Sequence, residues 1–367
     1  MNRTMRIIGT GMVLSLWAAL TLLAWFGSAK ALSEAERRPL AQMPELSADK
    51  LLSGSFMDKF ETYTLDQFPM RDSFRTLKSL FSYHAFRQTD NNGIYIQDGY
   101  LAKLEYPLQE ASLRHALKRF QFLYETYLQD TSSRIFMTVI PDKGYYLTEK
   151  NGYPAMDYKK LFEEIAAGMP WAQTVDITNS LDITDYYYTD THWRQEKLLE
   201  TAQVLCEALG VTAPQIGDFT QVLASQSFYG VYYGQAALPM KAEDLYLMKS
   251  PLLDACRVYN HETKTYQSVY DLAKLTGADQ YEVYLSGAQA LLTVENPNAS
   301  TDKELIVFRD SFGSALVPLL VQNYRTVTLV DIRYVHSSVL EQYLTFRGQD
   351  VLFAYSTLVL NSSTSLK

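Results

Sequence analysis

The stretch ELIVFRDSFGSALVPLL, residues 304–320, decides the fold of this chain. Residues 304–308 form an apolar run typical of a buried strand, a short polar turn with Ser311 follows, and an apolar helix is predicted to run through Leu319 and Leu320. Pro318 fits the early turns of that helix, where a missing N–H does little harm. A strand–turn–helix of this kind predicts a parallel sheet, with Ser311 at the carboxyl ends of its strands, where ligands bind in open α/β folds.

The turn at Ser311 allows two interpretations. The first N–H groups of the predicted helix would point at the serine, so an oxyanion formed there would be stabilised. Alternatively, Asp310 and Ser311 only cap the helix. A serine hydroxyl is a poor nucleophile without a base, so the first interpretation requires a histidine nearby.

The same alternation of helices and strands recurs on both sides of this stretch. In chain order it comprises a helix at 112–129, a strand at 134–140, a helix at 157–167, a strand at 174–177, and, after Ser311, a strand at 326–331, a helix near 337–346 and a strand at 350–355. Such alternation predicts parallel strands with helical crossovers. We therefore expect an α/β fold, a parallel sheet flanked by helices.

Two further segments do not follow this alternation of helices and strands. DNNGIYIQDGYLAKL, at 90–104, predicts a hairpin because Asn92-Gly93 and Asp98-Gly99 are turn formers. Residues from about 217 to 300 are rich in Tyr, Gln and Ser and in short alternating runs, so we expect a loop-rich insertion or cap. Residues 91–367 are accordingly predicted to form one domain with an insertion at about 217–300.

The N-terminus carries a candidate membrane span. Residues 7–29 are uncharged over a length that suffices to cross a hydrocarbon core. Arg3 and Arg6 precede the span, which predicts a cytoplasmic N-terminus and an outward-facing remainder. Residues 1–29 are thus interpreted as a cytoplasmic tail and signal-anchor, with cleavage at Ala29-Lys30-Ala31 as the alternative. Residues 30–90 are predicted to be a linker followed by two amphipathic helices, broken at Pro69.

Composition excludes several functions. The net charge is −8 and 20% of residues are charged, so no basic patch predicts a nucleic-acid partner. Cys206 and Cys256 have no metal-ligand spacing, and whether they form a disulfide is open. We expect neither a metal nor a cofactor. The 27 tyrosines suit a polar ligand groove as well as a polar β surface.

Of the five histidines, His192 in TDTHW, residues 189–193, has the most distinctive setting. A helix is predicted from near Thr191, as its N-cap, to Gly210, which places His192 in the first turn. The positive end of the helix dipole would lower the pKa of the imidazole and favour the neutral form. Asp190 could fix the tautomer and Trp193 could pack beneath the ring. An ordinary helix start is the alternative interpretation.

Ser311, His192 and Asp190 together supply a nucleophile, a base and an orienting carboxylate. Both segments follow strands of the predicted sheet, so their turns should open on the same edge. The hypothesis requires the His192 Nε2 and Ser311 Oγ atoms to approach within roughly 3 Å.

With DTHW followed by RDSF about 120 residues later, the chain resembles the DHHW family and the related periplasmic alginate O-acetyltransferase proteins, which have an SGNH-hydrolase-like domain. The resemblance covers most of the chain, including the N-terminal anchor, VIPDKGYY at 139–146, DSFGSALVPLL and DIRY at 331–334. The Asp-His pair precedes the serine, the reverse of the order in SGNH hydrolases and the same permuted order as in the alginate proteins. Thr191 departs from the DHHW name, but the Asp-x-His-Trp frame is kept.

The resemblance implies a triad of Ser311, His192 and Asp190 that transfers O-acetyl groups to an extracellular or cell-wall polysaccharide. It also implies a partner, a multi-span MBOAT-type acyltransferase that hands the acetyl group across the membrane. Arg333, Lys143 and Tyr188 are held as candidates for substrate binding. Two other functions stay open, an acetylesterase that uses the same triad and a non-catalytic envelope protein that binds glycan or acts as a scaffold.

Overall fold

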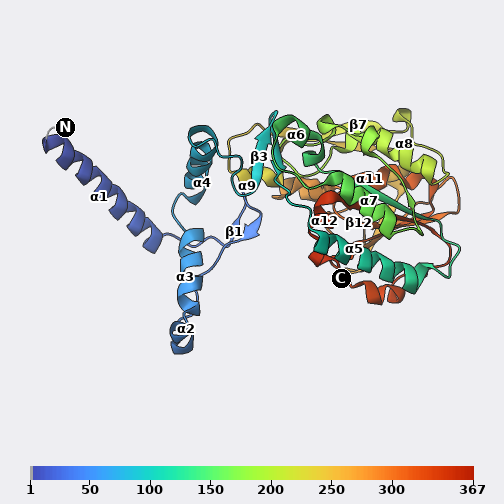
Figure 1. The fold of residues 1–367 in the computed structure, drawn as a ribbon, viewed down its shortest axis with the longest axis horizontal. Coiled ribbons are helices and arrows are strands. Elements are labelled where there is room, and N and C mark those ends of the chain that lie inside the picture. The colour runs from blue at the N-terminus through green and yellow to red at the C-terminus, as the bar shows by residue number, and fades with distance from the viewer. Residues whose placement is uncertain (1–2) are drawn as a thin grey trace. The chain divides into compact units, whose positions relative to one another are not determined.

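The computed structural model describes residues 3–367, apart from the side chains of residues 149–151. It divides into two compact units (Figure 1). Unit 1 comprises residues 3–91 with 234–239, and unit 2 comprises 92–233 with 240–367.

Unit 1 is helical. Its elements are α1 (Arg3–Phe26), β1 (Leu32–Ser33), β2 (Arg38–Pro39), α2 (Ala48–Leu52), α3 (Ser55–Asp66), α4 (Arg71–Leu80) and a π-helical turn (Phe81–Ala85). α1 has no buried residue and is long and apolar enough to cross a membrane. The two amphipathic helices predicted on either side of Pro69 are confirmed as α3 and α4.

Unit 2 is built on an eight-stranded sheet with the order β10-β9-β11-β13-β12-β14-β5-β6. Its strands are β5 (Ile135–Ile140), β6 (Gln173–Thr174), β9 (Arg257–Asn260), β10 (Thr265–Gln267), β11 (Leu291–Glu295), β12 (Glu304–Arg309), β13 (Thr326–Val330) and β14 (Asp350–Ser356). The neighbours from β13 to β6 are parallel. The predicted α/β class with a parallel-rich sheet is therefore confirmed.

The region predicted as an insertion is only partly a cap. β9, β10 and β11 come from it and extend the main sheet in antiparallel fashion. β11 joins because Leu292 and Val294 alternate toward the core, which gives it a buried face to match β13. The remainder contributes a hairpin of β7 (Thr220–Phe228) and β8 (Glu243–Lys249).

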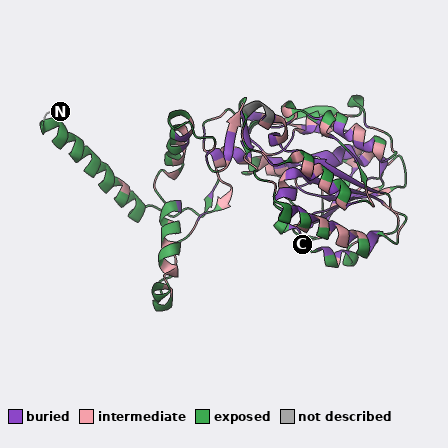
Figure 2. Cartoon of the chain, in the orientation of Figure 1, coloured by how far each residue is buried: buried purple, intermediate pink, exposed green. Residues whose placement is uncertain are grey.

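Helices cover both faces of the sheet, and the central strands alternate between two cores. Leu305 and Val307 of β12 belong to one core, Ile306 and Phe308 to the other. α8 (Leu199–Ala208) and α11 (Gly313–Leu316) pack in the first core, whereas α5 (Glu110–Leu123), α7 (Tyr158–Gly168) and α12 (Thr357–Asn361) pack in the second. The central strands are accordingly the most continuously buried part of this unit (Figure 2).

The predicted hairpin is β3 (Ile94–Gln97) paired with β4 (Tyr100–Lys103). Asp98 and Gly99 turn between them with φ of 50° and 84°. Both values lie in the left-handed region that a two-residue hairpin turn requires, which explains why the dipeptide predicted the turn.

Several boundaries differ from the prediction. The helix after Ser311 is a single α-turn, α11, that passes into 3₁₀ turns from Val317, because Pro318 has no N–H to continue the α pattern. β6 covers only Gln173–Thr174, and the helix expected near 337–346 is a 3₁₀ segment, Ser337–Gln342. α6 (Lys143–Asn151) was not predicted; Asp142 caps it by accepting from the Gly144 N–H.

Candidate active site

Ser311, His192 and Asp190 form one hydrogen-bonded chain in unit 2. The His192 Nε2 atom lies 2.8 Å from the Ser311 Oγ atom, and the His192 Nδ1 atom lies 2.6 Å from the Asp190 Oδ1 atom. Asp190 is buried, His192 is 9% exposed and Ser311 is half-buried. Solvent therefore reaches Ser311 but not Asp190. The distance required by the sequence hypothesis is met.

The Asp190 carboxylate is fixed by the main chain on both oxygens. Its Oδ1 atom also accepts the His192 N–H at 2.9 Å, and its Oδ2 atom accepts the Val231 N–H at 2.8 Å. A carboxylate is only an acceptor, so the His192 Nδ1 atom must be the donor. The Nε2 atom of the neutral ring is then left to accept the Ser311 hydroxyl proton, the tautomer that a general base needs.

His192 does not lie in a helix, which corrects the prediction. Residues 189–193 form an irregular turn, and α8 begins only at Leu199. The helix dipole therefore does not act on His192 in the way the sequence suggested. Thr191 is not an N-cap; its Oγ1 atom accepts a hydrogen bond from the Tyr232 hydroxyl at 3.0 Å.

A buried carboxylate, Glu243 at the start of β8, holds the turn in place. It accepts hydrogen bonds from the Tyr188 N–H at 2.7 Å, the Thr189 N–H at 2.8 Å and the Thr189 hydroxyl at 2.6 Å. Arg194 supplies the opposing charge at 2.7 Å. These bonds give the Tyr188 and Thr189 N–H groups, which have no helical partner, an acceptor. Sequence reasoning missed Glu243, because an acidic residue at the start of an alternating strand is an ordinary surface pattern.

Gly230 makes the close approach to the turn possible. A Cβ atom at this position would lie 2.2 Å from the Asp190 Cα atom, nearer than any real contact. The Gly230 N–H also donates to the Thr189 hydroxyl at 2.9 Å. The segment at 230–231 thus packs against Asp190 and donates a hydrogen bond to it, and only glycine leaves enough space at position 230.

Aromatic rings surround the imidazole. Tyr281 stacks on His192 with ring centroids 4.0 Å apart and planes 7° apart, and the Phe312 centroid lies 4.9 Å away. Trp193 packs edge-on against Phe312 and donates from Nε1 to the Phe312 main-chain oxygen at 3.0 Å. The ring stacked on His192 is thus Tyr281, which the sequence analysis did not single out.

Asp310 anchors the turn that carries Ser311. Its carboxylate accepts the Phe312 N–H at 3.0 Å and the Ser356 N–H at 2.7 Å, and its main-chain oxygen accepts the Gly313 N–H at 3.1 Å. Two of the N–H groups predicted to stabilise an oxyanion are therefore already engaged, which corrects that expectation. Among the N–H groups of residues 311–313, only that of Ser311 has no hydrogen-bond partner within residues 3–367.

Lys143 is buried next to the turn that carries His192, residues 189–193. Its Nζ atom donates to the main-chain oxygens of Tyr187 at 3.0 Å and Tyr188 at 3.4 Å, and lies 5.1 Å from the Tyr232 ring centroid. Burial lowers the pKa of Lys143 to about 7, although Asp190 and Glu243 act in the opposite direction. Its contacts are those of a group that supports the backbone before His192.

The other two binding candidates have different surroundings. The Arg333 guanidinium binds Asp331 through Nε at 2.9 Å and Nη2 at 2.6 Å; burial lowers its pKa, but these bonds outweigh burial and hold the pKa above its usual range. Tyr188 is 40% exposed and stacks on Tyr100 at 4.1 Å. It also lines a cavity of about 570 Å³ with Arg194, Glu243 and Tyr246, so its ring is accessible to a ligand.

Neither cysteine takes part. Cys206 and Cys256 are free, buried thiols, which answers the question of a disulfide for this structure. Burial raises the pKa of Cys206 to about 12 and that of Cys256 to about 11, so both stay protonated near neutral pH.

Comparison with known proteins identifies a similar family and similar folds. Residues 177–330, which contain Asp190, His192 and Ser311, match the family model described as DHHW protein. No protein of curated function matches the sequence. Among solved structures, a DHHW family protein from Eubacterium siraeum DSM 15702 is 20% identical, covers 75% of this chain and 94% of its own, and superposes with a TM-score of 0.61.

Two structures of PatB1 from Bacillus cereus also share the fold. One carries a sulfonyl adduct; it is 18% identical with a TM-score of 0.56 and covers 73% of this chain and 95% of its own. The other is 16% identical with a TM-score of 0.57 and covers 73% of this chain and 96% of its own. The resemblance to the DHHW family is therefore confirmed, together with its fold.

Proposed function

We propose that this chain, which matches the DHHW family over residues 177–330, is a membrane-anchored O-acetyltransferase that acts on a cell-surface or extracellular polysaccharide. The observation that carries the proposal is the hydrogen-bonded chain from Ser311 through His192 to Asp190. A nucleophile, a base with the correct tautomer and a buried orienting carboxylate are the requirements of acyl transfer through serine.

The reaction has two half-reactions. The Ser311 Oγ atom attacks the carbonyl of an acetyl donor while the His192 Nε2 atom takes the hydroxyl proton. The oxyanion of the tetrahedral intermediate accepts a hydrogen bond from the Ser311 N–H. His192 then donates its proton to the leaving group as the bond to the acetyl carbon breaks. In the second half-reaction a sugar hydroxyl attacks the acetyl-serine and the His192 Nε2 atom takes its proton. The bond between the acetyl carbon and the Ser311 Oγ atom then breaks, and His192 returns the proton to that atom.

The acetyl donor is proposed to come from a multi-span MBOAT-type acyltransferase in the same membrane. α1 supports membrane anchoring because its length and composition suffice for a span. Arg3 and Arg6 at its start favour a cytoplasmic N-terminus, so unit 2 is proposed to face outward, where the polysaccharide acceptor is found.

The test is direct detection of the acyl-enzyme. The full chain is incubated with an activated acetyl ester, and the acetyl group is located by mass spectrometry of the peptide that contains Ser311. Ser311→Ala should abolish the adduct, whereas Ser365→Ala, which removes an exposed serine, should not change it. Sulfonyl fluoride labelling provides a second readout, prompted by the sulfonyl adduct in one PatB1 structure. Normal acetyl labelling of Ser311→Ala overturns the proposal.

An acetylesterase is the second candidate, because the half-buried Ser311 is open to water as well as to a sugar hydroxyl. Comparing ester hydrolysis with transfer to added oligosaccharide separates the two. Rapid hydrolysis without any acetylated oligosaccharide favours the esterase. Full polysaccharide acetylation in cells that carry Ser311→Ala and His192→Ala would instead favour a non-catalytic scaffold.

A further inference from the structure

α4 and its flanks expose a continuous set of large apolar side chains. Phe68 and Phe74 contact each other edge-on with ring centroids 5.5 Å apart. The exposed set, called here the α4 apolar face, consists of Phe68, Met70, Phe74, Leu77 and Phe81. Members of this set are 40–65% exposed. Contiguous apolar surfaces of this kind mark interaction sites.

The opposite side of α4 is polar and points inward, which inverts the arrangement of a helix in a water-soluble domain. Arg71 forms an ion pair with Glu36, and Arg75 lies 3.3 Å from the same carboxylate. Ser79, one turn further, is buried and donates to the Ala236 main-chain oxygen at 2.7 Å. Arg71, Arg75 and Ser79 follow one another at four-residue spacing, so the inner face of α4 is fixed by charge and hydrogen bonds.

The start of α4 is held at the end of the candidate membrane span. The Gln67 side chain donates to the Lys30 main-chain oxygen and accepts the Lys30 N–H, both at 2.8 Å. Lys30 lies four residues after the end of α1, and Gln67 lies four residues before α4. These paired bonds fix the two ends against each other.

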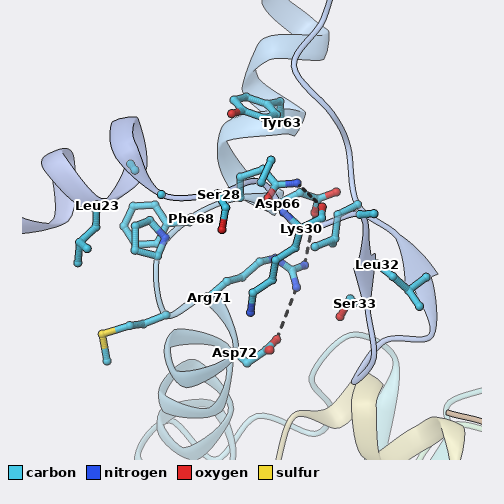
Figure 3. Close-up of a pocket in the computed structure, with 18 of the residues that line it drawn as sticks. Leu23, Ser28, Lys30, Leu32, Ser33, Tyr63, Asp66, Phe68, Arg71 and Asp72 are labelled. Atoms are coloured by element: carbon cyan, nitrogen blue, oxygen red, sulfur yellow. Dashed lines mark hydrogen bonds and ion pairs between the residues drawn. The ribbon is translucent and has the colours of Figure 1, made fainter. Parts of the chain in front are cut away.

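A groove joins the span and the α4 apolar face. It has a volume of about 960 Å³ and is lined by Leu23 and Gly27 at the end of the span as well as by Phe68 and Met70. Figure 3 labels Leu23, Phe68, Lys30 and Arg71 among the residues that line this groove. The apolar face therefore begins where the span leaves the hydrocarbon.

We propose that the α4 apolar face is a second membrane contact, which lies in the interfacial layer of the phospholipid bilayer that α1 enters. This inference rests on the proposed membrane anchoring. The bilayer that α1 is proposed to enter is the apolar phase next to Leu23, and Leu23 shares the groove with Phe68 and Met70 of the apolar face. Lys78, exposed beside Phe74 and Phe81 on the helix, is placed to reach lipid headgroups. The contact would fix the orientation of unit 1 on the membrane.

The test uses the full chain in phosphatidylcholine–phosphatidylglycerol vesicles. Leu77→Cys on the apolar face and Asp72→Cys, an exposed polar position of α4 outside that face, are each labelled with a bimane fluorophore. The native Cys206 and Cys256 are buried, so they compete poorly for the label. Quenching by doxyl-labelled lipid reports contact with the bilayer, and quenching by iodide reports contact with water.

Lipid quenching should be about threefold or more stronger at position 77 than at position 72, with the reverse order for iodide. Equal iodide quenching at both positions overturns the proposal, because the face is then solvated. Protection of position 77 from both quenchers also overturns it, because another part of the chain or a second copy then covers the face. Resistance of the chain to carbonate extraction tests the α1 anchor separately. Fluorescence quenching needs no catalytic turnover, so failure of this inference is distinguishable from failure of the acetyltransferase proposal.

Discussion

Trp193 donates a hydrogen bond from Nε1 to the main-chain oxygen of Phe312 at 3.0 Å. Trp193 follows His192 in the sequence and Phe312 follows Ser311, so this bond joins the two segments. Gln195 adds a second tie of the same kind, from its Nε2 atom to the Ala315 main-chain oxygen at 3.0 Å. These two bonds tie the segment that carries His192 to the segment that carries Ser311. The short distance between His192 and Ser311 depends on these flanking bonds.

Trp193→Phe should lower both stability and activity. The substitution keeps an aromatic ring against Phe312 but leaves a buried carbonyl without its donor, at a cost of about 1–3 kcal/mol in the free energy of unfolding. We expect kcat for an activated acetyl ester to fall roughly tenfold or more, because the serine and histidine lose their alignment. Trp171→Phe is the matched control, since Trp171 also donates from Nε1, to Gln121 at 2.9 Å, on a different element. Equal kcat values for the two variants would contradict this role.

Asp190→Asn should reduce kcat by roughly 10³–10⁴-fold, because an amide no longer compels the Nδ1 atom of His192 to be the donor. The ring can then present a protonated Nε2 atom to Ser311, which cannot act as a base. Steady-state kinetics should show a KM close to that of the unmodified chain. If kcat falls by less than about tenfold, Asp190 does not orient the base.

Gly230→Ala should disrupt the site by a steric clash. The added Cβ atom would lie 2.2 Å from the Asp190 Cα atom, so the turn that carries His192 must move. We expect a loss of about 1–3 kcal/mol in stability and a large loss of kcat/KM. Gly217→Ala is the control, because nothing lies within 4 Å of a Cβ atom there. Both are measured by thermal unfolding and ester hydrolysis; full activity of Gly230→Ala would show that the turn accommodates the methyl group.

Lys143→Met should remove a pH dependence of stability. Burial lowers the pKa of Lys143 to about 7 in the folded chain, below the ordinary lysine value that applies to the unfolded chain. Between roughly pH 7 and pH 10 the unfolded chain therefore binds the proton and the folded chain does not, so raising the pH stabilises the fold, by at most about 1.4 kcal/mol per pH unit. The Tm of the unmodified chain should rise relative to that of Lys143→Met across this window.

Lys159→Met provides the control for that measurement, because Lys159 is exposed on α7. Its Tm difference from the unmodified chain should stay flat over the same pH range. A pH-independent difference for Lys143→Met as well would show that the buried amine does not titrate in the window.

The sequence determined what depends on neighbours along the chain. The apolar run before Ser311 specified β12 because strand burial follows local hydrophobicity, and Asp98-Gly99 specified a hairpin because few residues adopt positive φ. The Asp-x-His frame brought its two side chains together because a two-residue separation permits contact in an irregular turn. The α/β class and the choice of Ser311, His192 and Asp190 came from such patterns.

Only the tertiary structure decided what surrounds these residues. Glu243 binds Thr189 across 54 residues, and Tyr281 reaches His192 from the region predicted to be an insertion. Periodicity predicted a helix at His192, but the buried carboxylates of Glu243 and Asp190 took up the main-chain N–H groups of that segment and made an irregular turn more favourable. Local sequence cannot contain this information, because a carboxylate is stable in the interior only when donors from distant parts of the chain meet it there.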